Sequence, residues 1–145
     1  MRIVLQRVLQ ASVRVDGVTA GSINKGILLL LGVHRDDTEA KADYLAAKCA
    51  DLRIFSDTLD KMNLSLREVN GEALVVSQFT LFGDCTKGRR PSFIEAAPPD
   101  KGRALYEYFV DRLKKQVAKV ATGTFGAMME VELVNDGPVT LILEK

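Results

Sequence analysis

Apolar positions in the first 33 residues follow the two-residue period and the short runs that are typical of β-strands. We expect strands over 2–15, Val18–Ile23 and Ile27–Val33, because the turn sequences Asp16-Gly17 and Asn24–Gly26 separate them. The third run is apolar throughout, which favours a central strand that is buried on both faces. Short turns between consecutive strands predict an antiparallel meander.

Two later stretches have apolar residues three or four positions apart, which is the spacing of an amphipathic helix. The first follows the cap candidates 36–38 and ends near Leu52. The second opens at Pro99 and Asp100 and has apolar residues at i+4 steps from Leu105 to Val117. The sequence therefore predicts two main helices.

The remaining apolar runs are short and are separated by Gly, Asn and Asp. We expect a strand at Arg53–Phe55, a segment Leu64–Val69 that pairs back, a hairpin turn at Asn70-Gly71 before a strand Leu74–Phe82, a turn at Ala121–Gly126, and last strands at Met128–Val134 and Val139–Leu143. The sum is about seven strands and two helices in a single α+β domain over residues 1–145. We expect an antiparallel or mixed sheet, closed toward a barrel, with the helices packed on it.

Composition narrows the class of protein. Hydrophobic residues make up 47% of the 145 residues, which suffices for a core, and the net charge of +1 argues against a strongly basic nucleic-acid binder. The longest apolar run, Ile27–Leu31, is too short to cross a membrane. Cys49 and Cys85 form no CxxC pair, which favours free thiols in a reducing compartment, so we expect a cytoplasmic protein. One histidine and the pair Asp57 and Asp60 predict neither a metal site nor a cofactor.

The segment Val75–Leu81 is the first candidate for chemistry, because Ser77, Gln78 and Thr80 interrupt an apolar run. A buried hydroxyl or amide without a partner costs about 1–3 kcal/mol, so either neighbouring backbone or a ligand must supply one. Ser77 and Thr80 are candidate nucleophiles only if a base activates them. The single histidine, His34, is better explained as a loop or cap residue, and the chain has no GxSxG elbow.

Gly137-Pro138 is the second candidate. X-Pro bonds are cis in only about 5–6% of cases, so a plain trans hairpin turn is one interpretation. The other is a segment that points two carbonyls in an unusual direction, because Gly relieves the restriction that Pro imposes on its neighbour.

A third candidate is the basic cluster Lys87, Arg89 and Arg90, within the long irregular segment Gly83–Pro99. It is either a solvated loop or a loop for phosphate capture beside a polar pocket.

Motifs along essentially the whole chain carry a resemblance to a known family. They are Gln6-Arg7-Val8, Ala11-Ser12-Val13, Gly26–Val33, Arg53–Asp57, Lys61-Met62-Asn63, Ser77–Leu81, Arg90–Phe93, Phe125-Gly126-Ala127 with Met129, and Asn135–Thr140. With Ser-Gln-Phe-Thr and Gly-Pro-Val-Thr both intact, the chain resembles the D-aminoacyl-tRNA deacylases.

This resemblance implies a homodimer with a barrel-like fold that acts on aminoacyl-tRNA. It implies that Gly137-Pro138 is cis and reaches into the site of the partner subunit, where its carbonyls meet the substrate amino group and leave no space for an L side chain. D-aminoacyl and glycyl esters then fit. Arg7 steadies the Gly-Pro segment.

The resemblance also assigns the other half of the site. Ser77, Gln78, Phe79 and Thr80 line the pocket for the 3′-terminal adenosine and the ester, and we include Met129 among the substrate-binding residues. Phe79 and Thr80 are the catalytic candidates.

An aminoacyl ester is already activated, so orientation and an oxyanion donor carry most of the catalysis. Backbone N–H groups at Phe79-Thr80 are the candidate donors, and the ribose hydroxyl beside the ester assists. Two alternatives stay open: a non-catalytic nucleic-acid-binding dimer on the same fold, and a small-ester hydrolase with Thr80 or Ser77 as nucleophile.

Overall fold

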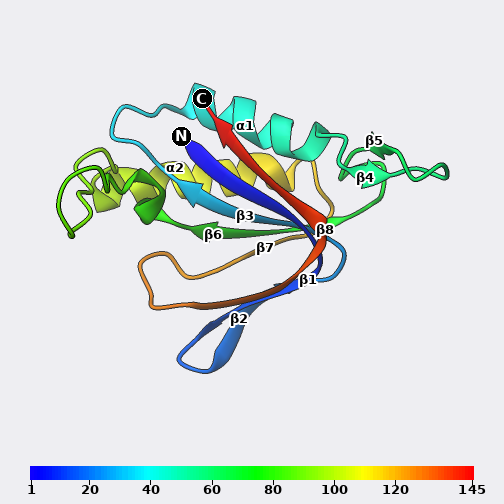
Figure 1. The fold of residues 1–145 in the computed structure, drawn as a ribbon, viewed down its shortest axis with the longest axis horizontal. Helices are drawn as coiled ribbons and strands as arrows, with labels where there is room; N and C mark the ends of the chain where they lie inside the picture. Colours follow the sequence, from blue (N-terminus) through cyan, green and yellow to red (C-terminus); the bar gives the residue numbers. More distant parts are fainter.

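The computed structural model describes residues 1–145 and has two helices packed on one face of a strongly curved sheet (Figure 1). No helix has the length and apolar character that crossing a membrane requires. The helices are α1 (Glu39–Asp51), α2 (Pro99–Lys114) and the short 3₁₀ helix η1 (Phe79–Phe82). The strands are β1 (Arg2–Val15), β2 (Val18–Ile23), β3 (Gly26–Gly32), β4 (Phe55–Ser56), β5 (Met62–Leu64), β6 (Glu72–Ser77), β7 (Val120–Thr122) and β8 (Glu130–Glu144).

Strand β1 is the axis of the sheet. Its residues 2–8 pair with β3 and its residues 11–15 pair with β2, while β8 runs antiparallel along nearly all of its other edge. The sheet order is therefore β2-β1-β3-β6-β7, with β8 also on β1. The predicted meander is wrong, because the 14-residue strand β1 is long enough to pair with β2 and β3 one after the other.

Strands β6 and β7 extend the sheet in parallel, with β6 beside β3 and β7 beside β6. A parallel pair needs a long crossover, which α1 and the β4–β5 hairpin supply between β3 and β6. The predicted hairpin at Asn70-Gly71 is therefore wrong. The predicted turn at Ala121–Gly126 is wrong for its first residues, which form β7, and is confirmed at Phe125-Gly126. The segment Leu64–Val69 contributes only its first residue to pairing, in β5.

Two apolar cores fill the fold. The larger lies between the sheet and the two helices, and its fully buried members include Phe55 and Phe109. The smaller lies inside the curve of the sheet and consists of Val8, Ala11, Val13, Ile23, Leu28, Leu74 and Val76. Strand β3 is apolar on both faces because Leu29 faces the helices and Leu28 faces the smaller core, which confirms its central position.

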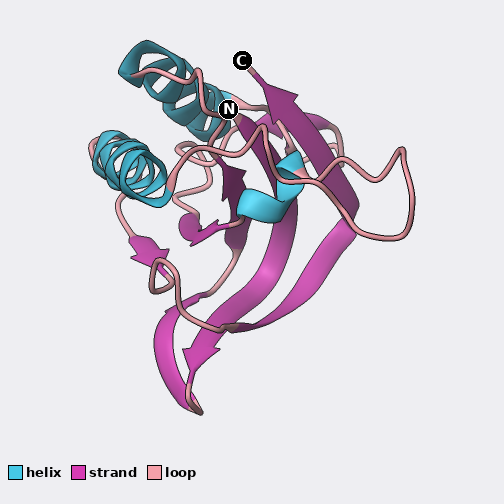
Figure 2. Ribbon diagram, turned by 90° about the vertical axis from the view of Figure 1, so that its left-hand side faces the viewer, coloured by secondary structure: helices cyan, strands magenta, loops and turns pink.

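The curve nearly closes the sheet into a barrel, as Figure 2 shows from the side. Strand β2 approaches β7 so closely that a Cβ added to Gly21 would lie 2.5 Å from the carbonyl oxygen of Thr122. Only glycine permits this contact, so Gly21 sets how far the two ends of the sheet can approach. The α+β fold with two helices on a barrel-like sheet is confirmed.

Candidate active site

The Ser-Gln-Phe-Thr segment, Ser77–Thr80, contains the end of a strand and the start of a 3₁₀ helix. Strand β6 ends at Ser77, and Phe79–Phe82 form η1, so the predicted strand through Leu81 is wrong in its second half. Gln78 makes the last sheet contact through its N–H, which donates to the Leu31 carbonyl at 2.8 Å. The polar residues therefore stand where β6 leaves the sheet, and they do not alternate along a buried strand.

The turn presents backbone and side chains to solvent. Phe79 is 57% exposed and Thr80 is exposed, while Ser77 and Gln78 are half-buried. The N–H groups of Phe79 and Thr80 donate to no acceptor among the hydrogen bonds of the turns and loops. The first turn of any helix leaves such donors free. Two free backbone donors thus follow directly after the end of β6 at Ser77.

No side chain is placed to activate Thr80 as a nucleophile. Its hydroxyl oxygen accepts a hydrogen bond from the Gln78 amide, and an amide nitrogen cannot take up a proton at neutral pH. His34 is a loop residue, as expected: its Nε2 lies 2.8 Å from a Glu95 carboxylate oxygen, and its Nδ1 accepts the Asp36 N–H. Burial raises the pKa of the Cys49 thiol to about 12, so it stays protonated in the core.

Gly137-Pro138 forms a bulge in a continuous strand. Gln6 pairs with Thr140 and Val8 pairs with Asn135, so two steps along β1 correspond to five along β8. Both sides of the bulge pair with β1 in the same direction, which excludes the hairpin turn. The Gly137-Pro138 bond is cis, as the resemblance implied, and Gly137 has a φ of +145° that disfavours any side chain.

Side chains within the same chain hold this bulge. The buried Arg7 donates from Nε to the Asp136 carbonyl at 2.9 Å and from Nη1 to the Ile54 carbonyl. The Asn135 side chain spans the base of the bulge: its Oδ1 accepts the Val139 N–H at 2.9 Å and its Nδ2 donates to the Val139 carbonyl at 3.2 Å. Gly137 and Pro138 themselves lie at the tip, and both are exposed.

The two motifs lie far apart in one chain. Strands β1 and β3 separate β8 from β6, which places the motifs about 14 Å apart across the sheet at about 4.8 Å per strand. Ser77 is level with Ile3 and the bulge is level with Arg7, which adds about 13 Å along the strands at about 3.3 Å per residue. The chain therefore does not bring Gly137-Pro138 beside Ser77–Thr80.

Met129 precedes β8 and packs against the smaller core, with its sulfur over Gly123. The residues of this core, among them Val8, Val13 and Val76, belong to neither motif. The aspartate loop also has a structural explanation. The Asp57 carboxylate accepts hydrogen bonds from Asn63 and from the Leu59 and Lys61 N–H groups, which lowers its pKa.

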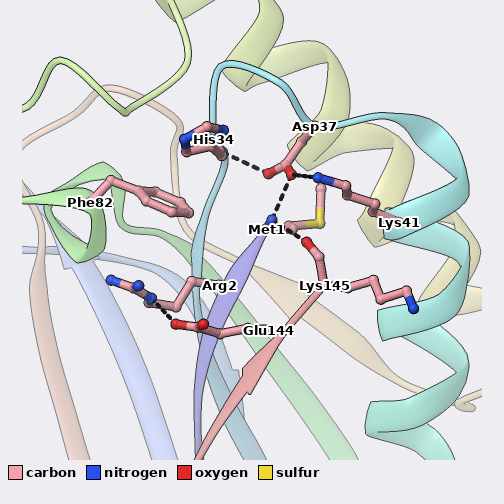
Figure 3. A pocket seen from close by; sticks show the side chains of 8 residues that line it. All are labelled: Met1, Arg2, His34, Asp37, Lys41, Phe82, Glu144 and Lys145. Atoms are coloured by element: carbon pink, nitrogen blue, oxygen red, sulfur yellow. Dashed lines mark hydrogen bonds and ion pairs between the residues drawn. The ribbon is translucent and has the colours of Figure 1, made fainter.

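A cavity of about 310 Å³ lies beside η1 and contains none of the predicted site residues. Figure 3 shows Arg2 and Glu144 on one side of it and the Met1 amino group with Asp37 on the other. Arg2 also donates to the Leu81 carbonyl at 2.6 Å, which ties β1 to η1. The cavity is lined by Met1, Arg2, His34, Asp37, Lys41, Phe82, Glu144 and Lys145.

The polar groups on one side of that cavity are joined in a hydrogen-bond network around Asp37. Burial alone would raise the pKa of Asp37, but hydrogen bonds from the Met1 amino group, the His34 N–H and Lys41 lower it below its usual value. The Met1 nitrogen lies 2.6 Å from Asp37 Oδ1, with both groups buried. We assign this network to joining the ends of β1 and β8 to α1.

Sequence reasoning did not single out two parts of the Gly-Pro clamp. Asn135 and the Ile54 carbonyl hold the bulge and its anchor Arg7, yet only their membership in longer motifs pointed to them. Asn135 lies only four residues before Val139, whose N–H it accepts, so a local side-chain-to-backbone bond of this kind could have been predicted from the sequence. The contact between Arg7 and the Ile54 carbonyl joins residues 47 positions apart and has no local signal.

Comparisons with known proteins identify the family of the chain. A family model described as D-Tyr-tRNA(Tyr) deacylase matches residues 4–144. A D-aminoacyl-tRNA deacylase from Thermotoga petrophila is 58% identical over 99% of this chain and 97% of its own length. One from Pelobacter propionicus is 59% identical over the full length of both chains.

Two solved structures share the fold. A chain named c-Myc DNA Unwinding Element Binding Protein is 38% identical, with a TM-score of 0.94 over 100% of this chain and 99% of its own. A probable eukaryotic D-amino acid tRNA deacylase is 21% identical with a TM-score of 0.83, covering 98% of this chain and 97% of its own. With the whole-chain family match and relatives near 60% identity, these findings establish that the chain belongs to the D-Tyr-tRNA(Tyr) deacylase family of hydrolases.

Proposed function

We propose that this protein hydrolyses the ester bond of D-aminoacyl-tRNA, and of glycyl-tRNA, to release the amino acid and the tRNA, and that it spares L-aminoacyl-tRNA. Membership of the family supports the reaction class. The cytoplasm, where tRNA is charged, is the compartment that this substrate implies. The proposed reaction uses no cofactor.

We propose that the active unit is a homodimer, because the motifs Ser77–Thr80 and Gly137-Pro138 lie far apart within one chain. Each motif reaches the surface, and about 20 Å separates them within one chain by the strand spacings given above. A two-fold interface brings the bulge of one protomer to the η1 turn of the other. Strand β8 is an open edge and exposes Val134 and Ile142, apolar surface that such an interface would cover.

Handedness is then selected by exclusion. The carbonyls of Gly137 and Pro138 accept the substrate ammonium, and the backbone beside them leaves room for hydrogen on one side of the α-carbon. Because Arg7 and Asn135 fix the bulge from within its own protomer, the backbone cannot retreat from an L side chain. Chirality is read without any side-chain contact to the amino acid.

The chemistry needs orientation more than a nucleophile. The free N–H groups of Phe79 and Thr80 stabilise the oxyanion, while Ser77 and Gln78 contact the terminal adenosine. The ribose hydroxyl beside the ester positions or activates the attacking water. Met129 lines the aminoacyl end of the pocket across the interface.

A second candidate function is non-catalytic nucleic-acid binding on the same fold. The 38% identical solved structure favours it, because that protein is named for binding a DNA unwinding element. A Thr80-nucleophile esterase is disfavoured, because the hydroxyl of Thr80 receives a hydrogen bond from Gln78 and meets no base.

Incubation of the purified protein with matched D- and L-tyrosyl-tRNA tests the proposal. We expect release of D-tyrosine and survival of the L ester, with the ratio of kcat/KM values set by backbone exclusion. Survival of both esters together with tight binding of uncharged tRNA would establish the second candidate instead. Equal cleavage of the two esters would remove the chiral role.

A further inference from the structure

The segment Asp84–Ser92 is a built hairpin. The Asp84 N–H donates to the Ser92 carbonyl at 2.8 Å, and the Ser92 N–H donates back to the Asp84 carbonyl at 2.9 Å. Asp84 Oδ1 accepts the Thr86 N–H at 2.9 Å, and the hydrogen bonds from Thr86 lower the pKa of Asp84. Gly88 turns the tip with a φ of +70°. Figure 1 shows this hairpin as the green loop beyond the end of β6.

The hairpin concentrates positive charge that nothing in the chain neutralises. Lys87, Arg89 and Arg90 are exposed, and none of them forms an ion pair. With Asp84 as its one acid, the segment carries a net charge of +2, whereas the whole chain carries only +1. The nearest acidic side chain along the chain after it, Glu95, is engaged by His34 and Arg35.

Both ends of the hairpin rest on the candidate active site. On one side the Gly83 N–H donates to the Thr80 carbonyl at 2.9 Å, one residue before the hairpin begins. On the other side the ring of Phe93 packs edge-on against the ring of Phe79, with centroids 5.1 Å apart. The basic tip therefore extends from the edge of the candidate active site at η1.

We propose that Lys87, Arg89 and Arg90 bind the phosphate backbone of the aminoacyl-tRNA next to its esterified end. This inference rests on the proposed function and names the part of the substrate that the hairpin contacts. Arginine forks match phosphate oxygens, and each free cation that meets a phosphate releases a counterion. The tip carries no aromatic side chain to stack a base, so the contact is independent of sequence and acts on every tRNA.

The test replaces the three cations with glutamine, Lys87→Gln, Arg89→Gln and Arg90→Gln. A matched control removes the same charge elsewhere by Lys25→Gln, Lys48→Gln and Lys61→Gln, three exposed lysines that also form no ion pair. KM and kcat are measured with D-tyrosyl-tRNA over a range of salt, and with D-tyrosyl-adenosine, which has no phosphate.

The hairpin variant should raise KM for D-tyrosyl-tRNA about tenfold or more and leave kcat within about twofold. The slope of log(kcat/KM) against log salt should fall by about 2, since each lost phosphate contact removes about 0.7–0.9. D-tyrosyl-adenosine should be cleaved as by the wild type, and the lysine control should match the wild type throughout.

Equal KM and salt slope in the two triple variants would overturn the proposal. So would an equal loss on D-tyrosyl-adenosine, because the hairpin would then shape the pocket and not hold phosphate. Binding of uncharged tRNA, followed by anisotropy with both variants, separates this question from the proposed reaction. If wild type cleaved no ester, weaker tRNA binding by the hairpin variant alone would still support the phosphate contact.

The exposed thiol of Cys85 gives a second readout, since the only other cysteine, Cys49, is buried. A thiol-linked photocrosslinker at Cys85 should attach to the tRNA within a few nucleotides of its 3′ end. Crosslinks confined to the anticodon arm would contradict the proposal.

Discussion

The two halves of the candidate site are held in opposite ways. The Gly137-Pro138 bulge reaches the surface at its tip but is anchored beneath by the buried Arg7 and by Asn135, each with two hydrogen bonds to the backbone beneath or beside the bulge. The η1 turn lies at the surface and is held by its own backbone turns, by the Phe79–Phe93 contact and by one side-chain hydrogen bond, from Arg2 to the Leu81 carbonyl. The bulge is braced by four hydrogen bonds from two side chains, whereas η1 has one such bond and presents free backbone donors on a short helix.

This difference matches what each half must do. A backbone that excludes an L side chain must not yield, because rejection depends on a clash that cannot relax. A turn that receives an adenosine and a developing oxyanion needs free donors and an open face. The contrast predicts that substitutions at the bulge act through rigidity, and that side-chain substitutions in η1 have smaller effects than changes to its backbone.

The largest expected effect on activity comes from disabling one half of the site in each of two chains and then combining the two chains in one dimer. Gly137→Ala places a Cβ 2.8 Å from the Val139 nitrogen at a φ that disfavours it, and Ser77→Trp places a bulky side chain at the end of β6, next to the η1 turn. Each homodimer should lose about 100-fold or more in kcat/KM, because displacement of the reacting groups by about 1 Å has that cost. A heterodimer of the two, purified through two tags, should recover about half of the wild-type rate, since one of its two sites combines intact halves.

A heterodimer that pairs the double variant with wild type is the matched control. If the halves come from different protomers, neither of its sites is intact and it should be inactive. The reverse pattern, an inactive mixed pair and an active control, would place both halves in one chain.

The next largest effect is expected from Arg7→Ala. It leaves the carbonyls of Asp136 and Ile54 without their donor, which should lower the free energy of unfolding by about 2–3 kcal/mol. Because the bulge is no longer held in place, the ratio of kcat/KM for L-tyrosyl-tRNA to kcat/KM for D-tyrosyl-tRNA should rise. Urea unfolding measures the stability, and deacylation assays with the two esters measure the ratio.

Arg7→Lys is its control, because it keeps the charge but lacks the planar fork that reaches both carbonyls. Its stability should fall between the wild type and Arg7→Ala. Unchanged D/L discrimination in a folded Arg7→Ala protein would contradict the role of Arg7 as the brace.

The smallest effect is expected from Thr80→Ala, because the backbone N–H groups of η1 are untouched. Its kcat/KM for D-tyrosyl-tRNA should stay within about threefold of wild type, and Thr80→Val should behave alike. By contrast, tRNA whose terminal ribose lacks the hydroxyl beside the ester should react about 100-fold more slowly, if that hydroxyl orients the water. Loss of activity in Thr80→Ala with normal cleavage of the deoxy substrate would identify Thr80 as the nucleophile.

Local sequence signals predicted most of the helices and strands but not which strands pair with one another. Asp16-Gly17 and the periodicity of residues 39–51 and 99–114 indicated the first hairpin and both helices, because turn chemistry and amphipathic spacing are local. Asn70-Gly71 has the same turn chemistry, yet no hairpin forms there, because β3 offers β6 a parallel edge and α1 makes the crossover. Ser77–Thr80 was identified as polar residues in an apolar run, but its turn into η1 was not.

By itself the sequence determined the class of fold, the polar residues that could act, and the two motifs that mark the family, because composition, period and motif are properties of the chain alone. Tertiary structure decided that β8 runs unbroken through Gly137-Pro138, that Arg7 reaches Asp136 and Ile54 from the core, and that the two motifs stand on distant strands. The physical reason is that strand pairing and the partners of a buried guanidinium depend on residues far apart in sequence, which only the folded chain brings together.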